Sequence, residues 1–215
     1  MNFNKHSNLE GCHAFLGASK YHWLNDNKKQ ITKRLCSQYA SSIGTYLHEF
    51  ARQRIKHGMK LTKNEKRSAI TFLLESGIPR VVLDSIDFDQ MFKNLIVYVN
   101  DCIGFHMTPE VVLYYSDICF GTADAIQYRE KDNLLRIHDL KTGSTPAHME
   151  QLIIYEALFC LEYRKKPHEI DSELRIYQNN DILVYNPTAE DILPVMDKIV
   201  TINNYIQNSL QIEEV

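Results

Sequence analysis

The sequence has no apolar run that could cross a membrane. A transmembrane helix needs roughly 20 consecutive apolar residues, and no stretch of the chain approaches that length. The N-terminal segment MNFNKHSNLEGCHAFLG also lacks the apolar core of a signal peptide. A GxxxxGK(S/T) segment is missing as well, which argues against a nucleotide-driven motor within this chain. These absences predict a cytoplasmic protein that makes no contact with a membrane.

The chain also lacks paired cysteines and a large excess of either positive or negative charge. Its five cysteines form no CxxC pair, and their odd number argues against both a disulfide framework and a zinc ribbon. Lys and Arg total 24 against 27 for Asp and Glu, which gives a net charge of -3. A protein that coats nucleic acid by bulk charge would be strongly basic. A local basic groove, or a cluster of acids that a metal neutralises, stays open.

A change of hydrophobic period divides the sequence near residue 105. Before it, apolar residues recur at helical spacing, and Gly or Pro ends each helical run. Three helices are predicted in this part: 41–57, 64–76 and 87–104. The first should turn its apolar stripe toward a core, through Leu47, Phe50, Ala51 and Ile55.

Beyond this point the sequence is rich in β-branched and aromatic residues. Two such runs, 111–130 and 134–141, surround a short polar turn and predict a hairpin. The remaining predicted elements are a helix at 148–163, a hairpin at 174–186 that turns at Asn179-Asn180-Asp181, and a helix at 188–209 capped by Thr188.

This succession of elements predicts one α+β domain over residues 1–215. Its sheet should be small and mixed, with helices packed against it. We expect a mainly helical part at 1–105, the sheet with one central helix at 106–187, and a C-terminal helix at 188–215.

Two acids and a lysine stand on the strands of the first predicted hairpin, where apolar residues would be expected. Side chains alternate along a strand, so Asp139 and Lys141 point the same way, and Asp124 lies within reach on the partner strand. Carboxylates buried at close range repel each other unless something neutralises them. Mg²⁺ prefers hard oxygen ligands, and a lysine beside it can hold a phosphate oxygen or orient a water. These residues predict metal-assisted phosphodiester hydrolysis, and a hairpin with solvated charges is the alternative.

The order of several short motifs resembles a known family. GxxD, a hairpin, DxK and QxxxY follow one another, with a histidine on an earlier helix. The matching residues are Gly121 with Asp124, Asp139 with Lys141, Gln151 with Tyr155, and His48. Upstream, HAFLGASKYHWLND (13–26) and ASSIGTYLHEFA (40–51) are similar to N-terminal signatures of phage-type proteins. From His13 to Tyr163 the chain thus resembles the RecB-like branch of the PD-(D/E)XK nuclease superfamily, which implies a restriction-endonuclease-like core.

The resemblance implies a metal centre with a catalytic lysine. Asp124 and Asp139 would bind Mg²⁺ or Mn²⁺, together with the backbone carbonyl of Leu140. Lys141 would be the catalytic lysine. Because both the lysine and the metal are drawn to anionic oxygens, both would have to fit around one phosphate.

Further residues match the family at the margin of this centre. Glu110 matches an acid that assists the metal or sits beside it, and an ordinary loop acid after Pro109 is the alternative. His48 would be a further metal ligand or a phosphate contact, although a lone helical histidine is usually structural. Contacts with DNA are implied for Gln151, Tyr155, Thr142 and Arg52. Gln151 and Tyr155 would position either the lysine or the nucleic-acid backbone.

The sequence departs from its relatives at the cysteines. Some RecB-like nucleases hold an iron–sulfur cluster with one early cysteine and three late ones. Here only Cys160 follows the start of the QxxxY motif, and Asn25-Asp26 stand where related N-termini often have Cys-Pro. We therefore expect no iron–sulfur cluster.

The resemblance implies a metal-dependent DNA exonuclease that serves phage or mobile-element replication or recombination in the host cytoplasm. Its substrate would be double- or single-stranded DNA, and a separate recombination or replication protein would be its partner. Two alternatives keep the same fold: an endonuclease or structure-specific nuclease, and a non-catalytic nucleic-acid-binding or regulatory protein. A third is an unrelated α+β protein with chance motifs.

Overall fold

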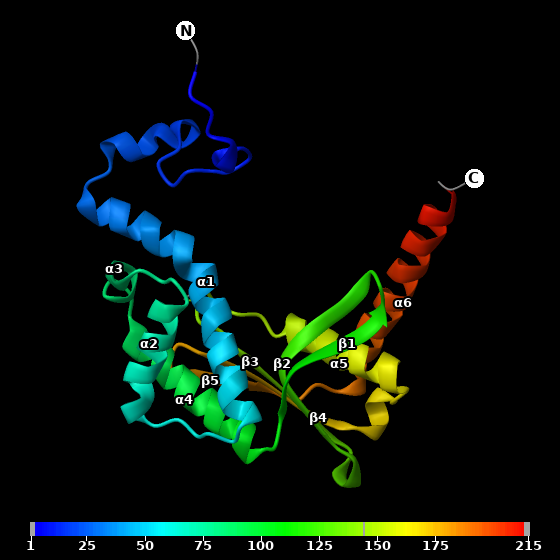
Figure 1. Cartoon of the computed structure of the whole chain (residues 1–215). Coiled ribbons are helices and arrows are strands. Elements are labelled where there is room, and N and C mark those ends of the chain that lie inside the picture. The colour runs from blue at the N-terminus through cyan, green and yellow to red at the C-terminus, as the bar shows by residue number, and fades with distance from the viewer. Residues whose placement is uncertain (1–2, 144, 213–215) are drawn as a thin grey trace.

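The computed structural model describes residues 3–143 and 145–212, and a five-stranded open sheet lies at its centre (Figure 1). The strands follow chain order across the sheet: β1 Thr108–Ser116, β2 Cys119–Arg129, β3 Leu134–Leu140, β4 Asp171–Gln178 and β5 Asp181–Tyr185. Neighbouring strands are antiparallel except β3 and β4, which are parallel. A parallel pair requires a crossover, and α5 Glu150–Tyr163 supplies it.

Helices cover both faces of the sheet, and each face has its own apolar core (Figure 1). One core contains residues of α1 Lys28–Lys56, α2 Lys66–Glu75, α3 Arg80–Leu83 and α4 Phe88–Gly104. The other contains residues of α5 and α6 Ala189–Ile212. Short 3-10 helices lie at Ser7–Leu9, Ala18–Asn25, Lys63–Glu65, Glu130–Asp132 and Pro167–Glu169. The predicted α+β class, with a small mixed sheet flanked by helices, is confirmed, and the PD-(D/E)XK type of core stays a prediction.

The first long helix starts earlier than predicted. It begins at Lys28 rather than at residue 41, although its core-facing residues are buried as expected. A capping box starts it: Asn27 Oδ1 accepts the Gln30 N–H at 3.0 Å, and Gln30 Oε1 accepts the Asn27 N–H at 2.8 Å. Residues 28–40 are largely exposed, so apolar periodicity carried no signal there. The Asn27-x-x-Gln30 pattern was the signal that could have found the start.

The predicted run 111–130 is two strands instead of one. Ser116 of β1 pairs with Cys119 of β2, so the chain reverses over Asp117 and Ile118. Apolar and aromatic residues continue on both sides of this two-residue turn, and they concealed it. The other predicted elements lie within a few residues of the observed ones. Residues 213–215 of the predicted C-terminal helical part lie outside the described residues.

None of the helices in the described part of the chain combines the length and apolar character that crossing a bilayer demands.

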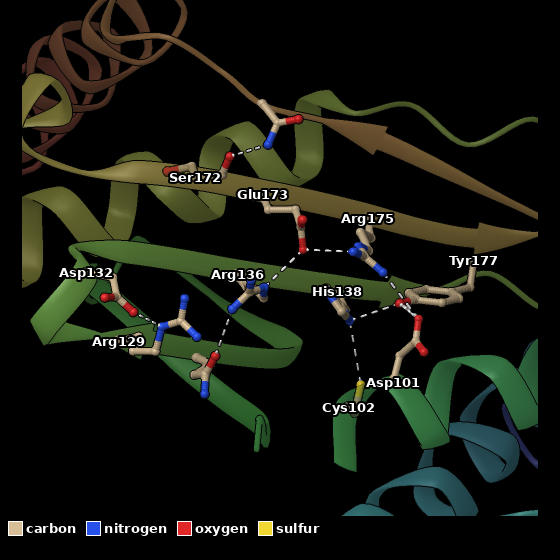
Figure 2. Close-up of polar contacts among 12 residues, drawn as sticks. Asp101, Cys102, Arg129, Asp132, Arg136, His138, Ser172, Glu173, Arg175 and Tyr177 are labelled. Carbon is tan, nitrogen blue, oxygen red and sulfur yellow. Dashed lines mark hydrogen bonds and ion pairs between the residues drawn. The ribbon is translucent and has the colours of Figure 1, made fainter. Parts of the chain in front are cut away.

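A buried polar network ties β3 and β4 to α4 (Figure 2). His138 Nδ1 lies 3.1 Å from the hydroxyl of Tyr177, and that hydroxyl donates to Asp101 Oδ2 at 2.8 Å. Burial and the charges of Arg175 and Arg136 lower the pKa of His138 to about 3. The ring is therefore neutral at ordinary pH, and its contacts tie the sheet to α4.

Glu156 on α5 is a buried carboxylate in the second core. Its Oε1 accepts a hydrogen bond from Ser172 Oγ at 2.6 Å, whereas Oε2 is buried without a partner among the described residues. Burial, together with the charge of Asp191, raises the pKa of Glu156 from 4.5 to about 7. Between these pH values the folded state keeps the proton that the unfolded state releases. Stability from this group is therefore full below pH 4.5 and is lost as the pH rises through about 7.

We expect this titration to lower the free energy of unfolding by about 3 kcal/mol between the two ends of that range, at about 1.36 kcal/mol per tenfold change in proton affinity. Glu156→Gln should remove this part of the pH dependence in urea unfolding near pH 5 and pH 8. Glu150→Gln, which changes an exposed glutamate of the same helix, serves as the matched control. Identical pH dependence in the wild type and Glu156→Gln would contradict the assignment.

Candidate metal centre

The candidate site lies where β2 and β3 separate. The two strands pair only as far as Ala125 and His138, while β3 continues to pair with β4. Asp124 and Asp139 are the next residues beyond that last pair. The Leu140 N–H, which has no strand partner on this side, donates to Asp124 Oδ2 at 2.9 Å. The divergence of the strands therefore brings both carboxylates to one end of the sheet.

Two further residues complete a cluster of potential ligands around Asp124. His48 reaches in from α1, and its Nδ1 lies 3.3 Å from Asp124 Oδ2. Glu110 comes from the neighbouring strand β1. One ligand atom from each of these three residues lies within 4.8 Å of the others. Two strands of one hairpin and a helix that is distant in sequence thus bring three of the predicted ligands together.

Glu110 has an unusual backbone for a strand residue. Its φ of 55° lies in the left-handed region, which costs a non-glycine residue roughly 1–2 kcal/mol. Strain of this kind persists only where the surroundings impose it, and it gathers at functional sites. Glu110 lies within β1, so it is a strand residue and not the ordinary loop acid that was the alternative.

The cluster concentrates negative charge in a partly buried space. Burial alone would lower the pKa of His48, but the hydrogen bond and charge of Asp124, with the charges of Asp139 and Glu110, raise it. Burial and the charge of Asp124 raise the pKa of Glu110. The same two causes raise the pKa of Asp139, against the opposing charge of Lys141. A cation at this position would relieve the repulsion among the carboxylates.

Asp139 and Lys141 form a second part of the site. Asp139 is 2% exposed, and Lys141 Nζ donates to its Oδ1 at 3.1 Å. Its Oδ2 lies 3.0 Å from the same Nζ, yet it has no hydrogen bond in the described residues. Lys141 Nζ also donates to Gln151 Oε1 at 2.8 Å. The lysine is thus held between the sheet and α5. It lies beside a buried carboxylate oxygen that can still accept a hydrogen bond.

Gly121 makes room for the residue that supports this lysine. Gln151 Nε2 donates to the Tyr155 hydroxyl at 2.9 Å, so Tyr155, Gln151 and Lys141 form a chain. A Cβ at Gly121 would lie only 2.8 Å from Tyr155 Cε1. The missing side chain of Gly121 therefore lets the Tyr155 ring approach the strand closely.

The residues present fit a divalent cation. Two carboxylates and one imidazole, from Glu110, Asp124 and His48, supply oxygen and nitrogen donors of the kind that Mg²⁺ and Mn²⁺ accept. Asp139, also predicted as a ligand, lies outside this group of three and contacts Lys141 instead. Asp139 Oδ2, whose contact in the described residues is the ion pair with Lys141, receives no hydrogen bond from them. Leu140 gives its N–H to Asp124, and a role for its carbonyl as a ligand stays a prediction.

The residues predicted to contact DNA have different surroundings in the structure. Gln151 and Tyr155 support Lys141. Thr142 lines a pocket of about 440 Å³ with Lys141, between α1 and α4. Arg52 instead gives its guanidinium to Glu49, with contacts of 2.6 and 2.7 Å, so this charge is already paired. A phosphate contact by Arg52 would require Glu49 to give way.

Two neighbours of the site were missed at the sequence level. Glu49 pairs with Arg52 at a spacing of three on α1, and that spacing was visible in the sequence. Gly44 was read only as part of a motif. A Cβ there would lie 3.1 Å from Thr142 Oγ1, so the glycine lets α1 approach the loop after β3. Contacts between such distant segments leave no local signal.

Comparisons of the chain with models of protein families, with curated proteins and with solved structures found no match.

Gly121→Ala should weaken the support of Lys141. The added methyl group displaces the Tyr155 ring, which loosens the hydrogen bond to Gln151. If the site cleaves DNA, as the sequence resemblance implies, the cleavage rate should fall by about 10- to 100-fold, as for other supporting contacts. The measurement is the initial rate on labelled DNA, with thermal unfolding to show that the fold persists. Gly104→Ala is the control, because a Cβ there meets nothing within 4 Å. Full activity in Gly121→Ala would contradict the supporting role of Tyr155.

The strain at Glu110 can be measured by comparing two variants that both lack the carboxylate. Glycine adopts the left-handed region without penalty, so Glu110→Gly should be more stable to urea than Glu110→Ala by about 1 kcal/mol. Both should bind Mn²⁺ more weakly than the wild type. Equal stabilities would mean that the backbone at residue 110 leaves the left-handed region once the carboxylate is removed. The contacts of the Glu110 carboxylate would then be the cause of the strain.

Proposed function

We propose that the protein is a Mg²⁺- or Mn²⁺-dependent nuclease that hydrolyses phosphodiester bonds in DNA as an exonuclease. The observation that supports this most directly is Asp139 Oδ2. It is a buried carboxylate oxygen without a hydrogen bond in the described residues, next to a lysine and to a second carboxylate. Most buried polar atoms have a hydrogen-bond partner, and this acceptor, unlike Oε2 of Glu156, lies beside the cluster of candidate ligands.

The residues divide into ligands and a lysine that acts on the substrate. When bound, Mg²⁺ or Mn²⁺ would supply Lewis acidity and a more acidic water. Asp124, Glu110 and His48 would hold it, with Asp139 facing the same space. Lys141, fixed by its contacts with Asp139 and Gln151, would hold a phosphate oxygen and stabilise the charge that develops there.

The choice of DNA and of an exonuclease draws on the order of motifs in the sequence. The GxxD, DxK and QxxxY residues meet in one place. This supports a RecB-like PD-(D/E)XK nuclease over an unrelated α+β protein with chance motifs. The exonuclease form follows the resemblance to phage-type relatives alone, and the test on circular DNA separates it from an endonuclease. A replication or recombination protein as partner belongs to the same proposal.

The test uses the wild-type protein with end-labelled linear DNA and with circular DNA, in Mg²⁺, in Mn²⁺ and in EDTA. We expect metal-dependent loss of linear DNA, no loss of circles, and no loss of either in EDTA. Cutting of circles would replace the exonuclease by an endonuclease of the same site. If the folded protein leaves every substrate intact in both metals, catalysis is refuted, and binding assays would then test the non-catalytic alternative.

A further inference from the structure

One face of the β1–β2 ribbon is uncovered. Leu113 and Ala123 are buried against the α5 side of the sheet, whereas the residues that alternate with them face outward. Tyr114 and Phe120 are directly paired across the strands and are 45% and 59% exposed. Val112, 52% exposed, extends the patch along β1. Single exposed apolar residues need no explanation, but a paired aromatic patch does.

The aromatic patch is continuous with the candidate metal centre. Glu110 lies four residues before Tyr114 on β1, and Asp124 lies four residues after Phe120 on β2. At about 3.4 Å per strand residue, the patch is about 14 Å from the acids. The Tyr114 hydroxyl donates to Asp117 at 2.9 Å, which holds its ring in place. A strand of nucleic acid that leaves the metal centre along the ribbon would therefore meet a fixed aromatic ring.

Charge is divided between this ribbon and the helix on the other side of the site. Residues 108–128 contain no Lys or Arg, so the ribbon offers a phosphate no cationic side chain from these residue types. Residues 27–48 of the α1 region contain no Asp or Glu, and their exposed basic residues are Lys28, Lys29, Lys33 and Arg34. In Figure 1 the N-terminal half of α1 and the β1–β2 ribbon rise on opposite sides of the sheet end. The basic half of α1 suits a phosphate backbone, and the aromatic patch of the β1–β2 ribbon suits bases.

We propose that Tyr114 and Phe120 stack on unpaired nucleobases, so that the substrate is single-stranded DNA or an unpaired DNA end. The inference rests on the proposed nuclease function and specifies its substrate. Aromatic rings stack on any base whose face is free, whereas the faces of bases inside a duplex are already stacked. The basic half of α1 contributes the phosphate contacts, which carry no preference for bases.

Three DNA probes of 20 units separate stacking from charge. They are a labelled dT oligomer, an abasic oligomer with the same phosphates but no bases, and a blunt duplex. Binding is measured by fluorescence anisotropy in EDTA, where metal-dependent cleavage is absent. The wild type should bind the dT oligomer at least about tenfold more tightly than the abasic one, given typical stacking energies. It should also prefer the dT oligomer to the duplex.

Variants then assign the preference to the ribbon. Tyr114→Ala/Phe120→Ala should lose the preference for dT over the abasic oligomer while keeping its affinity for the abasic one. Lys29→Ala/Lys33→Ala should weaken both by the same factor. Tyr205→Ala removes an aromatic residue that is 73% exposed on α6, which packs on the α5 side of the sheet, and should change neither. Circular dichroism confirms that each variant is folded.

The possible failures are distinguishable. If the wild type cuts DNA but the ribbon variant keeps the full dT preference, the stacking proposal is overturned and the nuclease proposal stands. A wild type that binds all three probes equally would overturn stacking in the same way. If ultracentrifugation instead shows self-association that the ribbon variant loses, without a dT preference in the wild type, a second copy of the chain covers this face. A wild type that neither binds nor cuts DNA would refute both proposals.

Discussion

Asp124→Asn should lower metal-dependent DNA cleavage by about a thousandfold. Asp124 is the residue that links the cluster, because its carboxylate accepts the Leu140 N–H and also meets His48. Asparagine keeps an oxygen for the N–H but removes the charge, so the fold should survive while the metal is lost. Stabilisation by a metal ion is worth several kcal/mol, and about 4 kcal/mol corresponds to three orders of magnitude in rate.

The prediction is checked by the cleavage rate in saturating Mn²⁺ and by direct measurement of Mn²⁺ binding. Asp171→Asn makes the same chemical change at an exposed position at the start of β4 and should leave both unchanged. Wild-type Mn²⁺ affinity in Asp124→Asn would remove the cluster from consideration as a metal centre. Lost binding with retained cleavage would place the catalytic metal elsewhere.

Lys141→Met should lower cleavage by about 100- to 1,000-fold, the range found when one donor to a developing negative charge is removed. Methionine retains the unbranched shape of the side chain but cannot donate to Asp139 or Gln151 or stabilise a phosphate. Removing a positive charge beside the carboxylates should leave Mn²⁺ affinity equal to or higher than that of the wild type. This combination separates a lysine that acts on the phosphate from a residue that merely maintains the metal site.

Both quantities are measured on one preparation of each protein, with single-turnover cleavage and Mn²⁺ titration. Lys131→Met, at an exposed position in the turn between β2 and β3, is the matched control and should behave as the wild type. Weakened Mn²⁺ binding in Lys141→Met would show that the lysine supports the ligands. Unchanged cleavage would exclude it from catalysis.

Local sequence signals predicted most elements of this fold. The β-branched and aromatic runs on either side of a short polar turn indicated strands, and the helical spacing of Leu47 and Phe50 indicated the buried stripe of α1. Element bounds were predicted wrongly where the apolar pattern was weak, or where it continued across a turn without a break. Residues 28–40 have little apolar periodicity, and the turn at Asp117 and Ile118 lies between two equally apolar strands.

The sequence by itself determined which residues are available for chemistry. The spacing in Asp139-x-Lys141 places both side chains on one side of β3, and their contact is observed. A spacing of four places Gln151 and Tyr155 on one side of α5, and they are hydrogen-bonded. Such arrangements are fixed by the period of a single strand or helix, so they can be read without a fold.

Only the tertiary structure decided which of these residues meet. Glu110 and Asp124 lie opposite each other in the β1–β2 hairpin, whereas His48 comes from a helix that no local period relates to them. Their meeting depends on where β2 leaves β3 and on how closely α1 packs against that end of the sheet. The strained backbone of Glu110 and the pairing of Arg52 with Glu49 depend equally on three-dimensional surroundings. Side-chain chemistry is encoded residue by residue, whereas the distances that make it a site arise from the packing of the whole chain.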